Sequence, residues 1–470
     1  MKKHLLGILS LMLALSGSAQ ESDNPWKKQI SEAVPLIKTN PEAAEDAFDT
    51  LLKGKNKKNT ALLVDIGEAY LGEGDTDTAL KYAERAKKVD SQCADAYVLS
   101  GDIAMARKDV NLASSEYNQA IYFDENCCEA YLKYADVYQG VNPELSIEML
   151  QRLETKAPDD DRVDKLMAEI YYGMGEYGKA IESYDNYMET GTPEVEDYIR
   201  YATLLYLNKE FDESLKLVNE GLAMDADNEV LQRLAMYDHY ELGDYDTGMQ
   251  HATAFFTRSD SAENVYLDHV YYGRLLKQKQ QYEDALLQFE EALELDSTKA
   301  EVYQDISTVY EEKQDYPQAI TAYQKYMDAL EEPEDMGHLF LYGRLNYYAA
   351  ADSTLKEMQP EYLAEADTTF ARVMEYAPEN YLGSFWRART NSLLDPETTE
   401  GLAKPYYETA LTILEQKPDA SVPLKVECLS YLGYYYFVKE DYPKSKEYWT
   451  KILAIDPENE TAKAAMEGMK

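Results

Sequence analysis

The stretch LLVDIGEAYLGEGDTDTALKYAERAKKVD, residues 62–90, contains two runs of apolar and small residues separated by a turn. The turn is at Gly74 and Asp75, and on each side of it an apolar or small residue returns every three or four positions. These residues are Leu63, Ile66, Gly67 and Tyr70 before the turn, and Ala79, Ala83 and Ala86 after it. The spacing predicts two amphipathic helices of about a dozen residues each, joined by a tight turn.

The same pattern recurs along most of the chain. The small residue within the first helix, Gly67 in this stretch, returns at intervals of 33 to 45 residues, most often 34. The eleven positions are Gly67, Gly101, Ala135, Ala168, Ala202, Met236, Gly273, Ser307, Gly343, Ala388 and Gly433. We therefore expect eleven helix pairs in series, because a period of this length is typical of proteins built from stacked structural repeats.

At these positions the sequence resembles the tetratricopeptide repeat family. That family has units of about 34 residues, with a small residue at the eighth place and an aromatic residue between small ones in the second helix. Second helices of this kind are ASSEYNQA at 113–120, ALLQFEEA at 285–292 and AITAYQKY at 319–326. The resemblance implies an all-α fold, an α-solenoid wound as a right-handed superhelix of about eleven to twelve tetratricopeptide-type helix pairs.

The chain ends and the irregular units complete the expected organisation. Residues 25–53 have the pattern of one more helix pair, with Asn40 as a helix cap before Pro41. The ninth and tenth units carry extra residues between their two helices. We expect a signal peptide at 1–19, a degenerate N-terminal helix pair at 20–58, repeat units one to six at 60–262, units seven and eight at 266–333, irregular units nine to eleven at 336–459, and a C-terminal capping helix at 460–470.

The first twenty residues, MKKHLLGILSLMLALSGSAQ, combine two lysines, an apolar run and small residues before Gln20. This is typical of a secretory signal peptide that is cleaved after Ala19. The apolar run is too short to span a bilayer permanently, and no lipoprotein cysteine follows the cleavage site, since the first cysteine is Cys93. We expect an exported protein, periplasmic or secreted, with no stable membrane insertion.

The chain is strongly acidic. Its net charge is −42, and loss of Lys2 and Lys3 with the signal peptide, which has no Asp or Glu, makes it 44 − 88 = −44. A chain with this charge repels nucleic acid and anionic lipid. We expect its partners to be other proteins or peptides, with no nucleic acid among them.

No motif for catalysis or cofactor binding is present in the sequence. There is no H-E-x-x-H, Cys-x-x-Cys, glycine-rich phosphate loop or G-x-S-x-G, and His239 and His269 fall on core positions of their units. We expect no enzyme activity, no cofactor and no bound metal. We also expect free cysteines, because Cys93 and Cys127 hold equivalent places in neighbouring repeats, too far apart for a disulfide.

The resemblance implies that the first helices line an inner groove, with places 2, 5, 6, 9, 12 and 13 of each unit facing it. Six of the twelve arginines fall on these places, where chance would put about two. Arginine beside aromatic residues is favoured in protein-binding hot spots. The predicted groove residues are Arg162, Lys165, Arg200, Tyr206, Arg233, Tyr237, Tyr240, Tyr271, Arg274, Lys277, Arg344, Tyr347, Trp386, Arg389, Tyr431 and Tyr434.

Two interpretations of these arginines remain open. They could bind an extended partner that bears carboxylates, or they could pair with the many Asp and Glu residues of neighbouring helices. The leading function is an exported protein-binding scaffold with no chemistry of its own. The alternative is a glycan- or nutrient-binding protein in which Phe385, Trp386, Tyr347 and Tyr348 form an aromatic platform.

Overall fold

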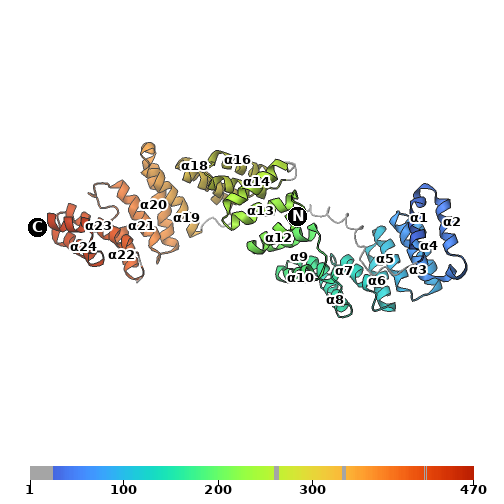
Figure 1. Ribbon diagram of the computed structural model, residues 1–470. Helices are drawn as coiled ribbons and strands as arrows, with labels where there is room; N and C mark the ends of the chain where they lie inside the picture. The colour runs from blue at the N-terminus through green and yellow to red at the C-terminus, as the bar shows by residue number, and fades with distance from the viewer. Residues whose placement is uncertain (1–24, 259–263, 331–334, 418, 420, 470) are drawn as a thin grey trace. The chain divides into compact units, whose positions relative to one another are not determined.

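The computed structural model describes residues 25–258, 264–330, 335–417, 419 and 421–469, so the predicted signal peptide at 1–19 lies outside the described residues. Every regular element in these residues is a helix, and Figure 1 shows the helices following one another as short pairs. No described helix is long and apolar enough to cross a membrane. The chain divides into two compact units, residues 1–224 and 225–470.

The first compact unit contains six helix pairs in its described residues. They are α1 (Lys27–Thr39) with α2 (Pro41–Leu51), α3 (Thr60–Gly72) with α4 (Thr76–Val89), α5 (Ala94–Ala106) with α6 (Val110–Phe123), α7 (Cys128–Tyr138) with α8 (Pro143–Glu154), α9 (Arg162–Gly173) with α10 (Tyr177–Thr190), and α11 (Val195–Leu207) with α12 (Phe211–Met224). A short 3-10 helix, η1 (Gly54–Lys58), leads from the first pair to the second. As predicted, the Asn40 side chain caps α2 just before Pro41.

The second compact unit also contains six described pairs, followed by a single helix. The pairs are α13 (Glu229–Glu241) with α14 (Tyr245–Arg258), α15 (Tyr266–Gln278) with α16 (Tyr282–Leu295), α17 (Ala300–Glu312) with α18 (Tyr316–Ala329), α19 (Met336–Ala351) with α20 (Gln359–Tyr376), α21 (Tyr381–Leu394) with α22 (Lys404–Glu415), and α23 (Val422–Val438) with α24 (Tyr442–Ile455). The last helix, α25 (Glu460–Gly468), packs on α24. The all-α solenoid of about twelve helix pairs is therefore confirmed.

Within each compact unit the first helices of successive pairs form an inner layer. In the first unit α3 contacts both α1 and α5, and in the second unit α15 contacts both α13 and α17. Within each unit a second helix packs on its own first helix and, in most repeats, on the first helix of the next pair, as α4 does between α3 and α5. First helices that touch one another line the inner side of a stack, and the predicted groove residues of each unit lie on these first helices.

The small residue at the eighth place lets a large side chain cross it. A Cβ atom added at Gly101 would lie 2.3 Å from the ring of Tyr117, and one added at Gly433 would lie 2.8 Å from the indole of Trp449. Tyr117 and Trp449 are the large residues of the second helix in their own pairs, and both are buried. The spacing found in the sequence thus corresponds to a contact between the two helices of a repeat.

The turn between the two helices has the same conformation in repeat after repeat. The fifteenth residue of the unit has a positive φ between 59° and 85° at Gly74, Lys108, Gly175, Lys209, Gly243, Gln280, Gln314 and Glu440. Only three of these eight residues are glycine, although the left-handed region costs other residues roughly 1 kcal/mol or more. The packing of the two helices therefore imposes the turn.

Two fully buried aspartates tie neighbouring repeats together. Asp268 lies at the third position of α15 and accepts hydrogen bonds from the Val265 backbone amide (2.8 Å) and the Tyr237 hydroxyl (2.5 Å). Asp197 holds the equivalent position in α11, where it accepts from the Glu194 amide at 2.9 Å and the Tyr187 hydroxyl at 3.1 Å. Each carboxylate thus caps its own helix and receives a hydroxyl from the preceding repeat.

The irregular tenth repeat has an ordered connection between its helices. The Asp395 carboxylate accepts hydrogen bonds from the backbone amides of Thr399 (2.9 Å), Glu400 (3.0 Å) and Gly401 (2.7 Å). Although burial opposes ionisation, these hydrogen bonds hold the pKa of Asp395 below its usual value. The extra residues therefore form a compact loop around one ionised side chain.

Candidate partner-binding groove

Each of the eight positively charged residues predicted for the groove forms an ion pair. The partner carboxylate lies on the first helix of a neighbouring repeat, so the pairs cross from one repeat to the next. They are Arg162 with Glu129 (2.5 Å), Lys165 with Asp197 (2.5 Å) and Arg200 with Glu169 in the first compact unit, and Arg233 with Asp268 (2.7 Å), Arg274 with Asp305 (2.8 Å), Lys277 with Glu312 (3.6 Å), Arg344 with Glu311 (2.9 Å) and Arg389 with Glu427 (2.7 Å) in the second.

These pairs neutralise the groove cations from within the protein. Arg389 is a clear case, because its Nε and Nη2 atoms each donate to one oxygen of Glu427 at 2.7 Å. Such a bidentate pair is strong, and it occupies the Nε–Nη2 edge of the guanidinium, which would otherwise be free to bind a carboxylate of a partner. Pairing of these cations with Asp and Glu residues of neighbouring helices, one of the two interpretations left open by the sequence, is therefore present. Recognition of a partner by the same cations stays a prediction.

The aromatic residues predicted for the groove differ in how much ring surface they offer. Tyr237 and Tyr271 are buried and stacked on each other with ring centroids 4.3 Å apart, and Tyr240 meets the edge of Tyr271 at 5.3 Å. In the eleventh repeat Tyr431 packs on Tyr407 at 4.7 Å, whereas Tyr434 is 45% exposed. Tyr434 is thus open to a partner, while Tyr237 and Tyr271 mainly fill the junction between two repeats.

The aromatic platform expected in the ninth and tenth repeats is half buried, and this corrects the expectation for Phe385 and Trp386. Phe385 and Trp386 are buried. Tyr347 and Tyr348 meet the indole of Trp386 edge-on, at centroid distances of 5.2 and 6.0 Å. Sugars stack on open ring faces, whereas these rings pack against one another and so contribute to the core.

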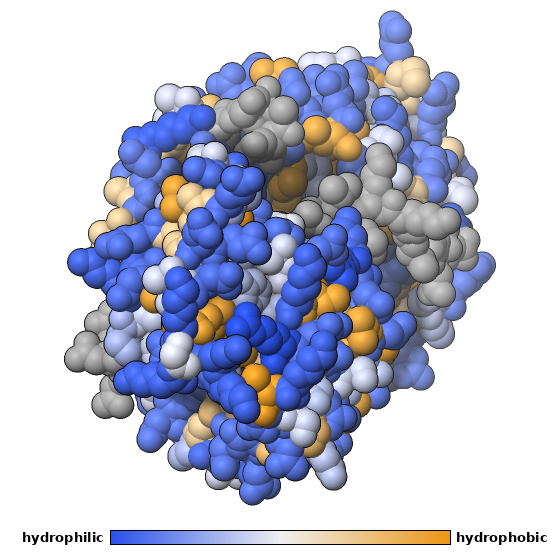
Figure 2. Space-filling model, turned by 90° about the vertical axis from the view of Figure 1, so that its right-hand side faces the viewer, coloured by the Kyte–Doolittle hydropathy of each residue, from blue (hydrophilic) through white to orange (hydrophobic). Residues whose placement is uncertain are grey.

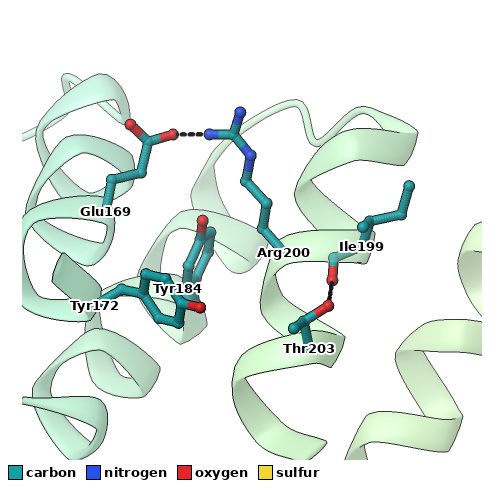
Figure 3. Close-up of a pocket in the computed structure, with 6 residues that line it drawn as sticks. All are labelled: Glu169, Tyr172, Tyr184, Ile199, Arg200 and Thr203. Carbon is teal, nitrogen blue, oxygen red and sulfur yellow. Dashed lines mark hydrogen bonds and ion pairs between the residues drawn. The ribbon is translucent and has the colours of Figure 1, made fainter. Parts of the chain in front are cut away.

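An open hollow of about 340 Å³ lies between α9, α10 and α11. Figure 3 shows Glu169 and Arg200 paired across its upper side, with the rings of Tyr172 and Tyr184 beneath them. Ile199 and Thr203 of α11 complete the wall, and the lining is mostly apolar; the Thr203 hydroxyl donates to the Ile199 carbonyl at 2.7 Å. The hollow can receive an apolar side chain beside a charged pair.

Only Arg200 among the residues of this hollow was predicted from the sequence. Tyr172 holds the twelfth place of the fourth unit, a place that the groove assignment already included, and it is 45% exposed. Tyr206 holds the same place in the fifth unit and contacts Phe211 at 5.7 Å. Assigning the twelfth place to the groove in every repeat, the fourth included, would have identified Tyr172.

Carboxylates follow one another along the inner face of the first repeats. The ninth place is Glu68 on α3, Asp102 on α5, Asp136 on α7 and Glu169 on α9. Desolvation and the charges of Asp65 and Asp102 raise the pKa of Glu68 to about 7, and desolvation also raises the pKa of Asp136 and of Glu169, the latter despite Arg200. Burial therefore opposes ionisation of these carboxylates, of which Glu169 is paired with Arg200 and Asp102 with Lys133.

Other side chains that could bind metals have structural contacts. In the described residues no group of three or more His, Cys, Asp or Glu side chains is arranged to hold a metal ion. His239 stacks on His251 at 5.4 Å, and His269 contacts Gln288 at 2.8 Å. The four cysteines are free thiols, and burial raises the pKa of Cys428 to about 12.

Two of the solved structures similar to this chain are of proteins described as tetratricopeptide repeat proteins. A profile of the tetratricopeptide repeat matches residues 64–126, which are units one and two. The crystal structure of the C-terminal part of a TPR repeat-containing protein from Cytophaga hutchinsonii is 28% identical, with a TM-score of 0.50, covering 57% of this chain and 98% of its own. PilF of Pseudomonas aeruginosa (17% identity, TM-score 0.40, 48% and 100% covered) and a tetratricopeptide repeat protein of Parabacteroides merdae (17%, 0.36, 53% and 98%) are more distant.

Proposed function

We propose that this chain, a tetratricopeptide repeat protein in its fold and in its matches, is a non-enzymatic scaffold that binds other proteins along its inner groove. We place it in the periplasm or outside the cell, on the strength of the N-terminal sequence. Protein binding is the general role of this kind of repeat. The observation that carries the groove assignment is the hollow between α9, α10 and α11, an apolar surface open to a partner.

The partner is an extended segment that places an apolar side chain between Tyr172 and Thr203. Affinity comes from fixed surface, because the helices that form the hollow are ordered before the partner arrives. An acidic segment, which the groove arginines suggested, would have to displace Glu169 from Arg200 or approach the remaining positive edge of the pair. We therefore assign the apolar contact the larger share of the binding energy and the carboxylate contact the smaller one.

A substitution that fills the hollow tests this proposal. Thr203→Trp places an indole where the partner side chain would go. Thr308→Trp is the matched control, since both threonines hold the ninth place of their repeats, both are half-buried, and both donate to the carbonyl four residues earlier, at 2.7 and 2.9 Å. Circular dichroism verifies that each variant keeps the helical fold.

The measurement is capture of proteins from a periplasmic extract by the immobilised full chain, quantified by mass spectrometry. We expect proteins held by the wild type and by Thr308→Trp to be reduced on the order of tenfold by Thr203→Trp, the loss typical of a blocked binding hot spot. Equal capture by both variants would remove the hollow from the binding site. Capture by the wild type no better than by bare beads would reject the scaffold function itself.

A further inference from the structure

The segment after α2 is the most positively charged part of an otherwise acidic chain. Residues 51–59, LLKGKNKKN, contain four lysines and no Asp or Glu, and Lys53–Lys58 lie on and just before η1. All four lysine side chains are exposed. None of them forms an ion pair with another described residue, in contrast to the groove cations, although the Lys53 ammonium donates to the Thr50 hydroxyl at 3.5 Å.

These lysines act on a partner as one charge. A 3-10 helix rises about 2 Å per residue, so the lysines of η1 lie within roughly 10 Å of one another along the chain. That is close to the screening length of about 8 to 10 Å in physiological salt. A short anionic segment at this loop therefore meets about four positive charges together, whereas a long polyanion would also meet the acidic rest of the chain.

An open hollow of about 620 Å³ lies beside the lysines and shares Lys55 with them. This volume is within the range of roughly 300–1,000 Å³ that is usual for ligand pockets. Trp26 and Leu51 supply apolar wall, and Trp26 is held in place because its indole N–H donates to Asp65 at 2.6 Å. Asn56, also in the wall, donates to the Leu51 carbonyl at 3.1 Å.

We propose that Lys53–Lys58 and the hollow beside Trp26 form a second docking surface, which binds an acidic segment of a partner protein through its carboxylates and one apolar side chain. A peptide segment fits both features, because it can place carboxylates on the lysines and a side chain in the hollow. The acidic rest of the chain repels anionic lipid, which favours a short peptide segment over a lipid surface. Figure 2 shows the side of the molecule that carries α1 and α2, where hydrophobic areas are small and separate.

Binding of a labelled peptide to the full chain tests the proposal. The probes are two fluorescein-labelled peptides of about ten residues, one of glutamates alone and one with a central leucine among glutamates, measured by fluorescence anisotropy in low salt. The test variant replaces Lys53, Lys55, Lys57 and Lys58 by glutamine. The control replaces Lys81, Lys88, Lys108 and Lys216 by glutamine, since these lysines are exposed, belong to no ion pair with described residues and give the same change in net charge.

We expect the test variant to bind the leucine peptide about tenfold more weakly, because each exposed pair of a lysine with a peptide carboxylate contributes roughly a factor of two. The affinity of the control should stay within about twofold of the wild type. The leucine peptide should bind more tightly than the glutamate peptide, and Thr203→Trp should leave both affinities unchanged because the groove is a separate site. Equal binding by the test variant, or no binding by the wild type, would overturn the proposal. So would co-sedimentation with phosphatidylglycerol vesicles in the absence of peptide binding.

Discussion

Replacement of Asp268 by alanine should be among the most damaging single changes in the inner face of the second compact unit. The Asp268 carboxylate is fully buried and accepts from Arg233 Nε at 2.7 Å, from the Tyr237 hydroxyl at 2.5 Å and from the Val265 amide at 2.8 Å. Its removal takes away the carboxylate to which the Arg233 guanidinium, the Tyr237 hydroxyl and the Val265 amide all donate. Breaking a buried pair in this way costs about 3–5 kcal/mol.

Glu196→Ala is the control for this prediction. The Glu196 side chain is 61% exposed and lies 3.2 Å from Arg200, which keeps its second partner, Glu169. An exposed pair of this kind contributes less than about 1 kcal/mol. Asp268→Asn should fall between the two, because an amide oxygen can still accept from Val265 while the charge is lost.

Hydrogen exchange is the appropriate measurement, because repeat proteins need not unfold in one step. The free energy of opening should fall by about 3–5 kcal/mol for amides of α13 and α15 in Asp268→Ala, and by less than about 1 kcal/mol for α9 and α11 in Glu196→Ala. If Asp268→Ala changed the opening free energy of α13 and α15 by less than about 1 kcal/mol, the buried carboxylate would not be what stabilises this junction.

Three further predictions concern the pH response, the packing and the thiols. The pKa of Glu68 is raised from 4.5 to about 7, so ionisation of its carboxyl lowers the stability of the native state as the pH rises from about 4.5 to 7. Glu68→Gln should therefore raise the free energy of unfolding in urea by about 1 kcal/mol above about pH 7, a value discounted for solvent exposure. At about pH 4, where Glu68 is protonated, the substitution should have no effect. Gly101→Ala should lower the melting temperature and cost about 1–3 kcal/mol because Tyr117 must move, whereas Gly72→Ala, with open space around it, should cost nothing. A thiol reagent should label the buried Cys428 only after denaturation, when all four cysteines react. Fewer than four reactive thiols after denaturation would show that a disulfide is present.

Much of the fold could be predicted because repetition makes weak local signals add. A glycine such as Gly67 or Gly101 says little alone, but its return in register with a large residue of the second helix indicates a contact that the structure contains. The twelve helix pairs follow from that pattern. The left-handed turn residues Lys108 and Lys209 could not be predicted in the same way, because lysine does not favour that conformation.

The candidate site was less predictable, for a different reason. Position in the repeat placed Arg200 and Tyr434 on the inner face, yet it could not show that Glu169 of the preceding repeat neutralises Arg200. It also suggested a platform at Trp386 where the structure has a buried cluster. The partner that a side chain meets depends on the residues of the neighbouring repeat, which a pattern within one repeat does not describe.

The sequence by itself determined the class of fold, the period, and which residues of each repeat meet inside a helix pair, because these depend on spacing along one or two helices. Only the tertiary structure decided which groove charges remain available, which rings are open and where hollows lie. Those properties arise between repeats, where Asp268 is buried under Arg233 and Tyr237, and where α9, α10 and α11 leave room beside Tyr172. In the proposed groove a partner would contact those junctions, so its binding would depend on contacts between side chains from different repeats.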